Sequence, residues 1–401
     1  MKPPRHNSDI AGDHRGDARN HCGRGGSPDS VVLRPKRGAI GAFAPPTSSD
    51  TFAQRLLAWY DQHGRKELPW QHPRTPYRVW LSEVMLQQTQ VATVVPYFDR
   101  FAYELPTLAA LANAPLDRIL ALWSGLGYYS RARNLHRAAQ YCVAHHDGEL
   151  PNDVEALAQL PGVGRSTAAA IAAQAYGTRA AILDGNVKRV LARRHGVEGD
   201  PSSPKTLARL WQHAEAQLPY ERLADYTQAQ MDLGATVCKR RNPDCHRCPV
   251  ADDCHARIHD AQHELPSPRA RRATPTRRAL LLVASDAEGR VLCETRPPRG
   301  IWGGLVSVPE FADRASLDAA CVALCATKPE PLAPFTHAFT HFRLEAEPYA
   351  TTIAAPASIG DNTRRFVARS ELDTLALPTP IRRLLVEYWN TECPAPSTAP
   401  A

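Results

Sequence analysis

Four cysteines stand close together in the second half of the chain, at Cys238, Cys245, Cys248 and Cys254, in the pattern C-x6-C-x2-C-x5-C. Thiolates are strong metal ligands, so four of them within 17 residues predict a metal centre. Structural zinc usually takes its ligands as two separated pairs, whereas one C-x2-C pair with a single cysteine on each side suits a 4Fe-4S cluster. The spacing favours the 4Fe-4S cluster over zinc, and buried thiols or a disulfide are the remaining alternative.

Three cations, Lys239, Arg240 and Arg241, lie between the first two of these cysteines. A loop that a cluster holds rigid and that carries three positive charges suits the binding of DNA phosphates. The alternative is a basic loop that only faces water.

A second candidate for nucleic-acid binding is the L-P-G-V-G segment at residues 160–164, between two stretches of helical periodicity. Gly162 and Gly164 permit a tight turn, and the amides around Val163 and at the start of the next helix would point outward as an anion site. This is the form of a helix-hairpin-helix. On its own it is also compatible with an ordinary turn between two helices.

Helices must position these candidates, and the hydrophobic pattern predicts helices nearly throughout 51–257. Strand-like runs at 278–285 and 290–295, joined by a hairpin signal at 286–289, and a further run at 338–350 predict strands after that. With helical patterns at 316–325 and 379–389 they predict an α+β domain. The segments in between and at the ends are rich in Pro, Gly, Arg and Ser and lack a hydrophobic period. The predicted organisation is a disordered tail (1–50), an all-α domain (51–260), a basic linker (261–277), an α+β domain (278–392) and a second tail (393–401).

The composition excludes several classes of protein. The chain has 401 residues, 43% of them hydrophobic, which is enough for one large core or two ordinary ones, and a formal net charge of +7. Its longest apolar runs fall far short of the roughly 20 residues that cross a bilayer, and the N-terminal residues contain no apolar signal region. We therefore expect a soluble cytoplasmic protein whose cysteines are available to a metal.

The motifs together resemble a known family. A helix-hairpin-helix, then I-L-D-G-N-V at 182–187, then the cysteine pattern is similar to the endonuclease III superfamily of base-excision DNA glycosylases. Within it, W-L-S-E-V-M-L-Q-Q-T-Q-V at 80–91 and G-L-G-Y-Y-S-R-A-R-N-L at 125–135 resemble the adenine-specific MutY family. The resemblance covers roughly residues 51–390 and implies a multidomain fold: an all-α helix-hairpin-helix glycosylase domain with a 4Fe-4S loop, then a Nudix-like α+β domain.

The resemblance implies two catalytic carboxyls, Glu83 and Asp184. Glu83 has Val79 and Trp80 one helical turn before it, and burial there would raise its pKa, so that it could protonate a purine and then act as a base toward water. Asp184 precedes a predicted helix, where a fixed carboxylate can face the positive charge that develops on the sugar. From the local sequence alone, Glu83 could lie on a helix surface and Asp184 could serve only as a helix cap.

Ser166 stands where bifunctional members of the superfamily carry the lysine that forms a Schiff base. A serine cannot form an imine, so a monofunctional mechanism that uses water is expected. Lys188 lies close to Asp184 in sequence and is the nearest candidate for a side reaction.

Further site residues follow from the resemblance. Tyr128 is similar to the wedge that the family inserts when a base is flipped out, although it could also be a core tyrosine. Arg131 and Ser166, with the hairpin and the basic loop, are expected at the DNA. The residues expected around the adenine, each of which could also serve packing, are Trp70, Gln71, Gln87, Asn186 and Gln228.

The second domain resembles the Nudix-like lesion-recognition domain of the same family. The resemblance lies in 296–305 and in Phe339, Thr340 and His341, whose alternative is a turn at a strand end in which only Phe339 packs. A Nudix hydrolase needs further carboxylates after its G-x5-E start, and here D-A and C-V stand at those places. The domain is therefore expected to detect a damaged base rather than hydrolyse nucleotides.

The resemblance, together with these residues, implies a monofunctional adenine DNA glycosylase that acts on double-stranded DNA with adenine opposite 8-oxoguanine or guanine. We expect a monomer, located in a bacterial cytoplasm and associated with the nucleoid through DNA. There are three alternatives. Ser166 argues against a bifunctional glycosylase/lyase for oxidised pyrimidines, and the missing carboxylates argue against a nucleotide hydrolase. The pair Glu83 and Asp184 argues against a non-catalytic DNA-binding protein.

Overall fold

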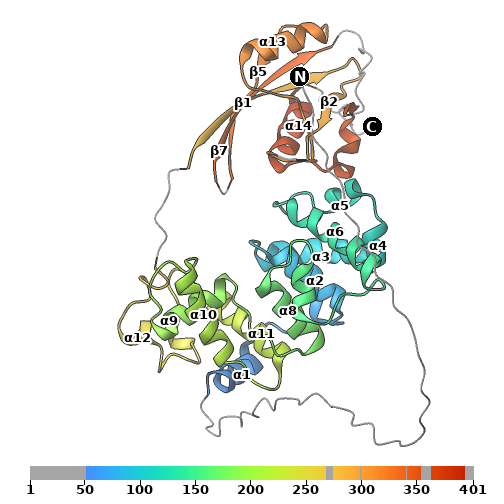
Figure 1. Cartoon of the computed structure of the whole chain (residues 1–401). Coiled ribbons are helices and arrows are strands. Elements are labelled where there is room, and N and C mark those ends of the chain that lie inside the picture. The colour runs from blue at the N-terminus through green and yellow to red at the C-terminus, as the bar shows by residue number, and fades with distance from the viewer. Residues whose placement is uncertain (1–50, 268–273, 299, 340, 354–362, 393–401) are drawn as a thin grey trace, which may run out of the picture. The chain divides into compact units, whose positions relative to one another are not determined.

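The computed structural model describes residues 51–267, 274–298, 300–339, 341–353 and 363–392 (Figure 1). The two predicted tails, part of the predicted linker, and Thr340 lie outside the described residues. None of the described helices is both long and apolar enough to cross a membrane.

The first part of the described chain, residues 51–267, is helical, as the sequence pattern predicts. We call it the helical region. Its α-helices are α1 (Phe52–His63), α2 (Pro76–Leu86), α3 (Val91–Glu104), α4 (Leu108–Asn113), α5 (Leu116–Leu122), α6 (Ser130–His145), α7 (Val154–Gln159), α8 (Arg165–Tyr176), α9 (Gly185–His195), α10 (Pro204–Ala216), α11 (Leu223–Asp232) and α12 (His255–Ile258). Short 3-10 turns lie at Pro69–Gln71 (η1) and Cys245–Arg247 (η3), and a π-helical turn at Leu233–Val237 (η2) continues α11.

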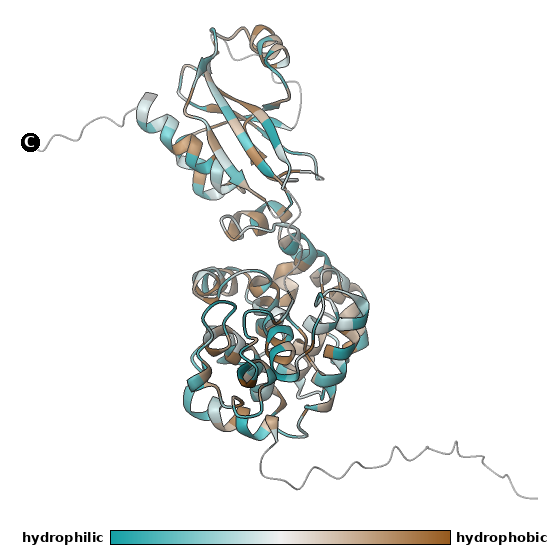
Figure 2. Cartoon of the chain, turned by 90° about the vertical axis from the view of Figure 1, so that its left-hand side faces the viewer, coloured by the Kyte–Doolittle hydropathy of each residue, from teal (hydrophilic) through white to brown (hydrophobic). Residues whose placement is uncertain are grey.

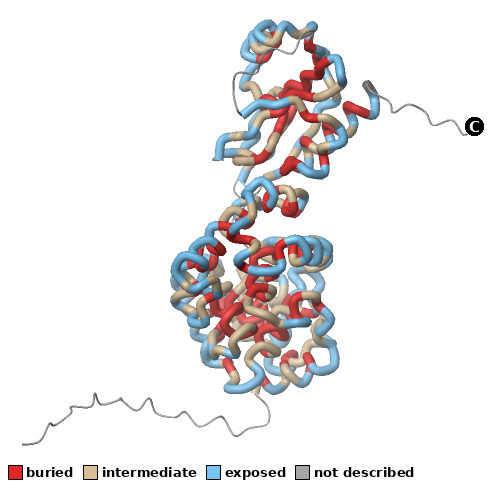
Figure 3. The backbone as a smooth tube through the Cα atoms, turned by 90° about the vertical axis from the view of Figure 1, so that its right-hand side faces the viewer, coloured by how far each residue is buried: buried red, intermediate tan, exposed pale blue. Residues whose placement is uncertain are grey.

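Side chains at the helix starts fix where several of these helices begin. Thr51 and Gln54 form a reciprocal capping box at α1, and the hydroxyl of Thr75 accepts from the amide of Arg78 at α2. Hydrophilic and hydrophobic residues alternate along the helices (Figure 2), and buried residues gather in the interior (Figure 3). Amphipathic helices of this kind are held mainly by the burial of their apolar faces.

The second part of the described chain, residues 274–392, contains one mixed sheet with helices, which confirms the predicted α+β class. We call it the sheet region. Its elements are β1 (Thr276–Ser285), β2 (Val291–Thr295), β3 (Val306–Ser307), β4 (Glu310–Phe311), α13 (Arg314–Ala323), β5 (Glu330–Pro331), β6 (Phe335–Ala338), β7 (Arg343–Thr352), β8 (Arg364–Val367), the 3-10 helix η4 (Arg369–Thr374) and α14 (Thr379–Glu392). Strands β1 and β7 run parallel over their whole length, and the other pairings are antiparallel.

Both faces of β1 are buried, because a helix packs on each face of the sheet. Leu282 and Ala284 share a buried cluster with Leu317 of α13. At the end of β1 the hydroxyl of Tyr388, in α14, donates to Ser285 at 2.9 Å. An apolar strand that is covered on both sides reads as a continuous hydrophobic run, which is the pattern at residues 279–284.

Candidate active site

The helical region holds a cavity of about 950 Å³ lined by residues of η1, α2, α8, α9 and α11 and of the segments around them. Most of the residues that the sequence analysis assigned to catalysis or to the adenine contribute to it. They are Trp70, Glu83, Gln87, Asp184, Asn186 and Gln228, and Ser166, which was expected at the DNA, lines the cavity as well. Segments far apart in the sequence therefore converge on one space that is large enough for a nucleotide.

Glu83 lies on α2, is partly buried and lines the cavity. Its Oε1 accepts a hydrogen bond from Nε2 of Gln174, on α8, at 2.8 Å. Burial raises the pKa of Glu83 to about 7, with a smaller contribution from the charge of Asp184, while the bond from Gln174 opposes the rise. A carboxyl with this pKa can give up a proton and take one back near neutral pH.

Asp184 lies at the cavity wall as the cap of α9. Its Oδ1 accepts from the amide of Val187 at 2.7 Å, so the expected capping role is present. Burial raises the pKa of Asp184, while that amide and the nearby Arg189 guanidinium oppose the rise. Capping fixes one carboxylate oxygen, and the side chain still lines the cavity that Glu83 enters.

Gln228 is held by a buried ionic group behind the cavity. Its Nε2 donates to Oδ1 of Asp232 at 2.8 Å, and Asp232 is fully buried. The same carboxylate accepts from the backbone amide, Nε and Nη2 of Arg65, at 2.6 to 2.8 Å. With its amide nitrogen engaged in this way, Gln228 offers the cavity its carbonyl oxygen, a hydrogen-bond acceptor.

Trp70 and Gln71 are neighbours in η1 but face different spaces. Trp70 is buried, lines the cavity and packs edge-on against Phe98 at 5.3 Å between ring centroids. Gln71, expected at the adenine, instead lines a second hollow of about 230 Å³, and its Oε1 accepts from the amide of Leu68 at 3.3 Å. Side chains of successive residues in a 3-10 turn point about 120° apart, since the turn has about three residues.

The predicted hairpin is present between α7 and α8, and it is tied to the cavity. Gly162 has φ +80°, and a Cβ there would meet the side chain of Asn134 at 2.7 Å, so only glycine fits. The amide nitrogen of Gln87 donates to the carbonyl of Gly162 at 3.3 Å. Ser166 accepts from the amide of Leu183 at 2.9 Å, which anchors the segment that carries Asp184.

Two residues expected at the DNA surface are internal instead. Arg131 is 6% exposed, and its guanidinium donates to five backbone carbonyls, among them Met85 and Gln87 at 2.6 Å each. It therefore satisfies the last carbonyls of α2 rather than a phosphate. Val163 is 5% exposed and its amide donates to Leu160, so neither group is offered to DNA. Tyr128 is 46% exposed with φ +48°, a geometry compatible with the expected wedge.

The four cysteines surround one small hollow at the end of the helical region. Within the part of the chain that the structure describes, no three His, Cys, Asp or Glu side chains converge closely enough to hold a single metal ion. A common space lined by four thiols suits a cluster that takes one cysteine ligand at each iron. Arg193 contributes to the same hollow, and its Nη1 lies 3.4 Å from Sγ of Cys238.

Two arginines of α9, the helix that Asp184 caps, bind the backbone of the cysteine loop. Arg189 donates to the carbonyl of Cys238 at 2.8 Å and to Oδ1 of Asn186 at 2.9 Å. Arg193 donates to the carbonyls of Lys239 and Arg240 at 2.7 and 3.2 Å. The backbone of the basic loop is thus fixed, while the side chains of Lys239, Arg240 and Arg241 remain exposed.

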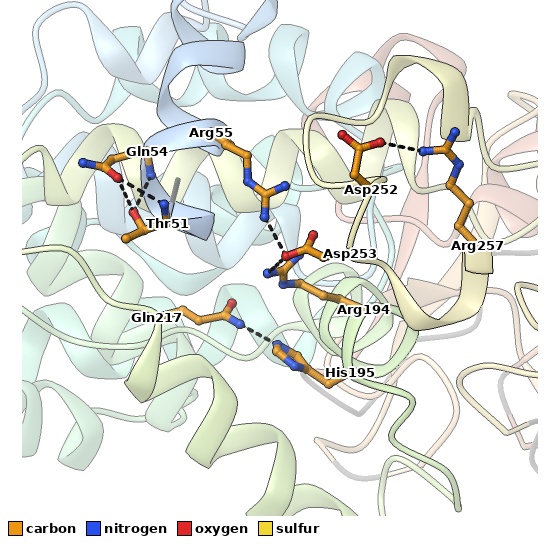
Figure 4. A network of polar contacts seen from close by, with 9 residues as sticks. All are labelled: Thr51, Gln54, Arg55, Arg194, His195, Gln217, Asp252, Asp253 and Arg257. Carbon is orange, nitrogen blue, oxygen red and sulfur yellow. Dashed lines mark hydrogen bonds and ion pairs between the residues drawn. The ribbon is translucent and has the colours of Figure 1, made fainter. Parts of the chain in front are cut away.

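A carboxylate next to the last cysteine fastens the loop to two helices. Asp253 binds Arg194 of α9 through both carboxylate oxygens and Arg55 of α1 at 2.7 Å (Figure 4). These two guanidinium groups hold the pKa of Asp253 well below its usual range. Neighbouring Asp252 pairs with Arg257 at 3.1 Å and is almost fully exposed.

Comparison with known proteins agrees with this geometry. Residues 81–216 match the HhH-GPD superfamily base excision DNA repair protein model, residues 238–254 the iron-sulfur binding domain of endonuclease III, and residues 279–387 the NUDIX domain. An adenine DNA glycosylase of Buchnera aphidicola is 33% identical over 344 residues, which cover 84% of this chain and 97% of the relative. This chain belongs to the adenine DNA glycosylase family. The human adenine DNA glycosylase is 40% identical over 299 residues, covering 72% of this chain and 54% of the relative.

Among solved structures, a thermostable thymine-DNA glycosylase is 28% identical and covers 52% of this chain and 95% of its own, with a TM-score of 0.48. The predictions of a base-excision repair enzyme, of a helical domain followed by a Nudix-like domain, and of an iron-sulfur loop are confirmed. As an adenine DNA glycosylase, the chain binds a 4Fe-4S cluster through the loop at 238–254 and acts on DNA.

The sequence analysis missed several residues that hold the site of this glycosylase together. Gln174 contacts Glu83 from 91 positions away, and Asp232 orients both Arg65 and Gln228. For Gln174 the sequence offers one signal, a polar residue inside an apolar helical stretch, which demands a partner when it is buried. Asp232 follows the largely polar residues 225–230 and carries no such signal.

The Nudix-like region lacks free carboxylates at its G-x5-E motif. Glu310 pairs with Arg277 at 2.7 Å and with Arg296 at 2.8 Å, so the one glutamate of the motif is neutralised. Phe339 stacks on Phe342 at 4.4 Å between centroids, and His341 is exposed beside it. The expected recognition loop thus contains one packed and one exposed ring, and Thr340 between them lies outside the described residues.

Proposed function

We propose that this glycosylase excises adenine opposite 8-oxoguanine or guanine by hydrolysis, and that Glu83 is its general acid. The observation that carries the proposal is that Glu83, with a pKa of about 7, and Asp184 line the same cavity. At neutral pH a large fraction of Glu83 is protonated. It can therefore give its proton to a ring nitrogen of adenine, N7 in the proposed mechanism, so that the base leaves as a neutral molecule.

Asp184 takes the complementary role. As the glycosidic bond lengthens, positive charge develops at C1′ of the sugar, and a carboxylate fixed by the helix start can stabilise it or bond to it. Glu83, after losing its proton, then accepts one from the attacking water. The two carboxyls differ in what surrounds them: Asp184 accepts from the helix-start amide of Val187 and lies near Arg189, both of which oppose the effect of burial and favour its ionised form, whereas burial raises the pKa of Glu83 to about 7.

The cavity wall matches the edge of an adenine. The carbonyl oxygen of Gln228 accepts from the exocyclic amine, since its amide nitrogen is engaged by Asp232. Trp70 supplies an apolar wall. Gln87 and Asn186 complete the polar contacts, and we propose no adenine contact for Gln71, because its side chain lines the other hollow.

The reaction ends with water rather than with a lysine. Ser166 occupies the place of the Schiff-base lysine in bifunctional relatives, and its hydroxyl accepts from Leu183. The product is therefore an intact strand with an abasic site. Lys188 lies in the first turn of α9 and is the remaining amine close to Asp184.

DNA is held from several sides by one chain, which acts as a monomer in this proposal. The hairpin backbone at Gly162 and Gly164 and the exposed cations Lys239, Arg240 and Arg241 bind phosphates. Exposed Tyr128 fills the space left by the flipped nucleotide.

The Nudix-like region reads the base opposite the adenine in this proposal. The exposed ring of His341, which contacts Phe342, supports this role, and the neutralised Glu310 argues against hydrolysis of nucleotides. Replacing Thr340 and His341 by alanine tests the assignment. The preference for 8-oxoguanine over guanine should fall by about 1–3 kcal/mol, the worth of one good base contact. An unchanged preference would place lesion reading elsewhere.

The direct test of the reaction is incubation with a duplex that contains one 8-oxoguanine:adenine pair. Release of adenine, with strand cleavage only after alkali, is the expected result. Cleavage without alkali would identify a bifunctional lyase. If no adenine were released from any mispair, the protein would be a non-catalytic DNA-binding protein.

A further inference from the structure

The carboxyl of Glu83 has one protein partner at its inner end, the side chain of Gln174. Nε2 of Gln174 lies 2.8 Å from Oε1 of Glu83. Gln174 is 5% exposed and belongs to the apolar part of α8, where Ala168 to Ala173 are all buried. An amide in such a place is costly unless it is bonded, so the bond to Glu83 accounts for its presence.

Gln174 acts from behind the cavity. Glu83 lines the cavity, whereas Gln174 does not contribute to its wall. A nucleotide in the cavity would therefore touch the carboxyl of Glu83 but not the amide that holds it. This arrangement separates the group that reacts from the group that orients it.

We propose that Gln174 is a positioning residue that keeps the acidic proton of Glu83 on Oε2, the oxygen available to the substrate. The proposal rests on the proposed role of Glu83 as general acid. An amide N–H donates and cannot accept a proton, so an oxygen that receives it remains the acceptor in both protonation states of the carboxyl. The proton is thereby excluded from Oε1, and the carboxyl cannot turn about its last bond without losing the contact.

The same bond adjusts the acidity of Glu83. Burial favours the protonated form, and a donor at 2.8 Å favours the ionised form, so the two effects oppose each other. Without the donor the pKa of the carboxyl would rise further, so a smaller fraction of Glu83 would be ionised at neutral pH. A hydrogen bond to a charged group in a buried place shifts a pKa by about one unit.

The test replaces Gln174 by methionine, which fills a similar volume without a donor, in the full-length protein with its cluster. Single-turnover excision from an 8-oxoguanine:adenine duplex is measured across pH, together with duplex affinity. We expect the descending limb of the rate to move to higher pH by about one unit. We also expect the rate below pH 6 to fall roughly tenfold because the carboxyl is no longer fixed. Duplex affinity should not change, since Gln174 does not reach the cavity.

Gln230 provides a matched control. It is also a buried glutamine on a helix, 4% exposed, and it donates to the hydroxyl of Tyr226 at 3.3 Å rather than to a catalytic group. Gln230→Met should lose stability like Gln174→Met but keep the wild-type pH profile. If Gln174→Met also keeps that profile, or shifts it to lower pH, the positioning role is wrong. Gln174→Leu provides a second apolar variant should the methionine variant fail to fold.

The failure of this inference differs from failure of the proposed function. An inactive Glu83→Gln variant with an unshifted Gln174→Met profile would overturn only the role of Gln174. An active Glu83→Gln variant would overturn the proposed role of Glu83 itself, and the inference with it.

Discussion

Nε2 of Gln228 donates to Oδ1 of Asp232 at 2.8 Å, and Asp232 is itself held by three nitrogens of Arg65. This chain of contacts fixes which end of the Gln228 amide faces the cavity. The amide nitrogen cannot turn toward a ligand without leaving a buried carboxylate short of a donor. If Gln228 contacts the base as proposed, the specificity for an exocyclic amine depends on Asp232, which does not line the cavity.

Gln228→Leu should lower excision of adenine by roughly tenfold, the worth of one hydrogen bond, while excision of unsubstituted purine at the same position changes little. Purine lacks the amine that the Gln228 oxygen accepts from, so it serves as the internal control. The measurement is single-turnover excision on two duplexes that differ only in that base. An equal loss on both would show that Gln228 acts through packing.

Arg131→Leu should reduce the free energy of unfolding by at least about 3 kcal/mol, because five backbone carbonyls lose a buried donor. Arg118→Leu is the control, since Arg118 forms an exposed ion pair with Glu104, worth about 1 kcal/mol at most. Urea unfolding measures both. If the Arg131→Leu protein were as stable as the wild type but bound DNA more weakly, Arg131 would be a DNA contact rather than a structural residue.

Asp253→Asn should speed the loss of the iron-sulfur cluster to a chelator by a few-fold. The variant loses the charged contacts that hold the cysteine loop to α1 and α9, and ion pairs of this exposure are worth about 1 kcal/mol. The visible absorbance of the cluster is followed over time. Asp252→Asn, one residue earlier and exposed, should lose its cluster at the wild-type rate. Equal rates for both variants would remove Asp253 from cluster retention.

Glu83→Gln should become progressively more stable than the wild type as pH rises from about 4.5 to about 7. The folded pKa of Glu83 lies above its unfolded value, so the unfolded chain loses the proton first and wild-type stability falls over that range. The upper limit of the gain is about 3 kcal/mol, since one pKa unit corresponds to about 1.4 kcal/mol. Unfolding at pH 5 and pH 8 measures it. A constant difference between the two proteins would mean that Glu83 keeps an ordinary pKa.

The sequence predicts the elements of this site better than their contacts. The cysteine spacing and the glycine turn are visible as local patterns, whereas the carboxyls Glu83 and Asp184 follow from the resemblance to the adenine-specific family. The roles of Gln174 and Asp232 are not visible in the sequence, since each depends on a partner far away in the chain.

Side-chain direction is the other limit. Arg131 lies in a motif full of cations, and no local pattern distinguishes an arginine that faces DNA from one that binds the carbonyls of α2. Gln71 follows Trp70 directly, yet Trp70 lines the cavity with Glu83 and Gln71 lines the second hollow, because successive side chains of η1 point in different directions. Only the packing of several helices decides such cases.

The central claim is that Glu83 supplies the proton that releases adenine. The most direct test is single-turnover excision from an 8-oxoguanine:adenine duplex by Glu83→Gln at pH 7, with duplex affinity measured on the same preparation. Glutamine keeps the size and the bond to Gln174 but has no acidic proton. The account predicts a rate at least roughly 100-fold lower with unchanged affinity. Excision at close to the wild-type rate would contradict it.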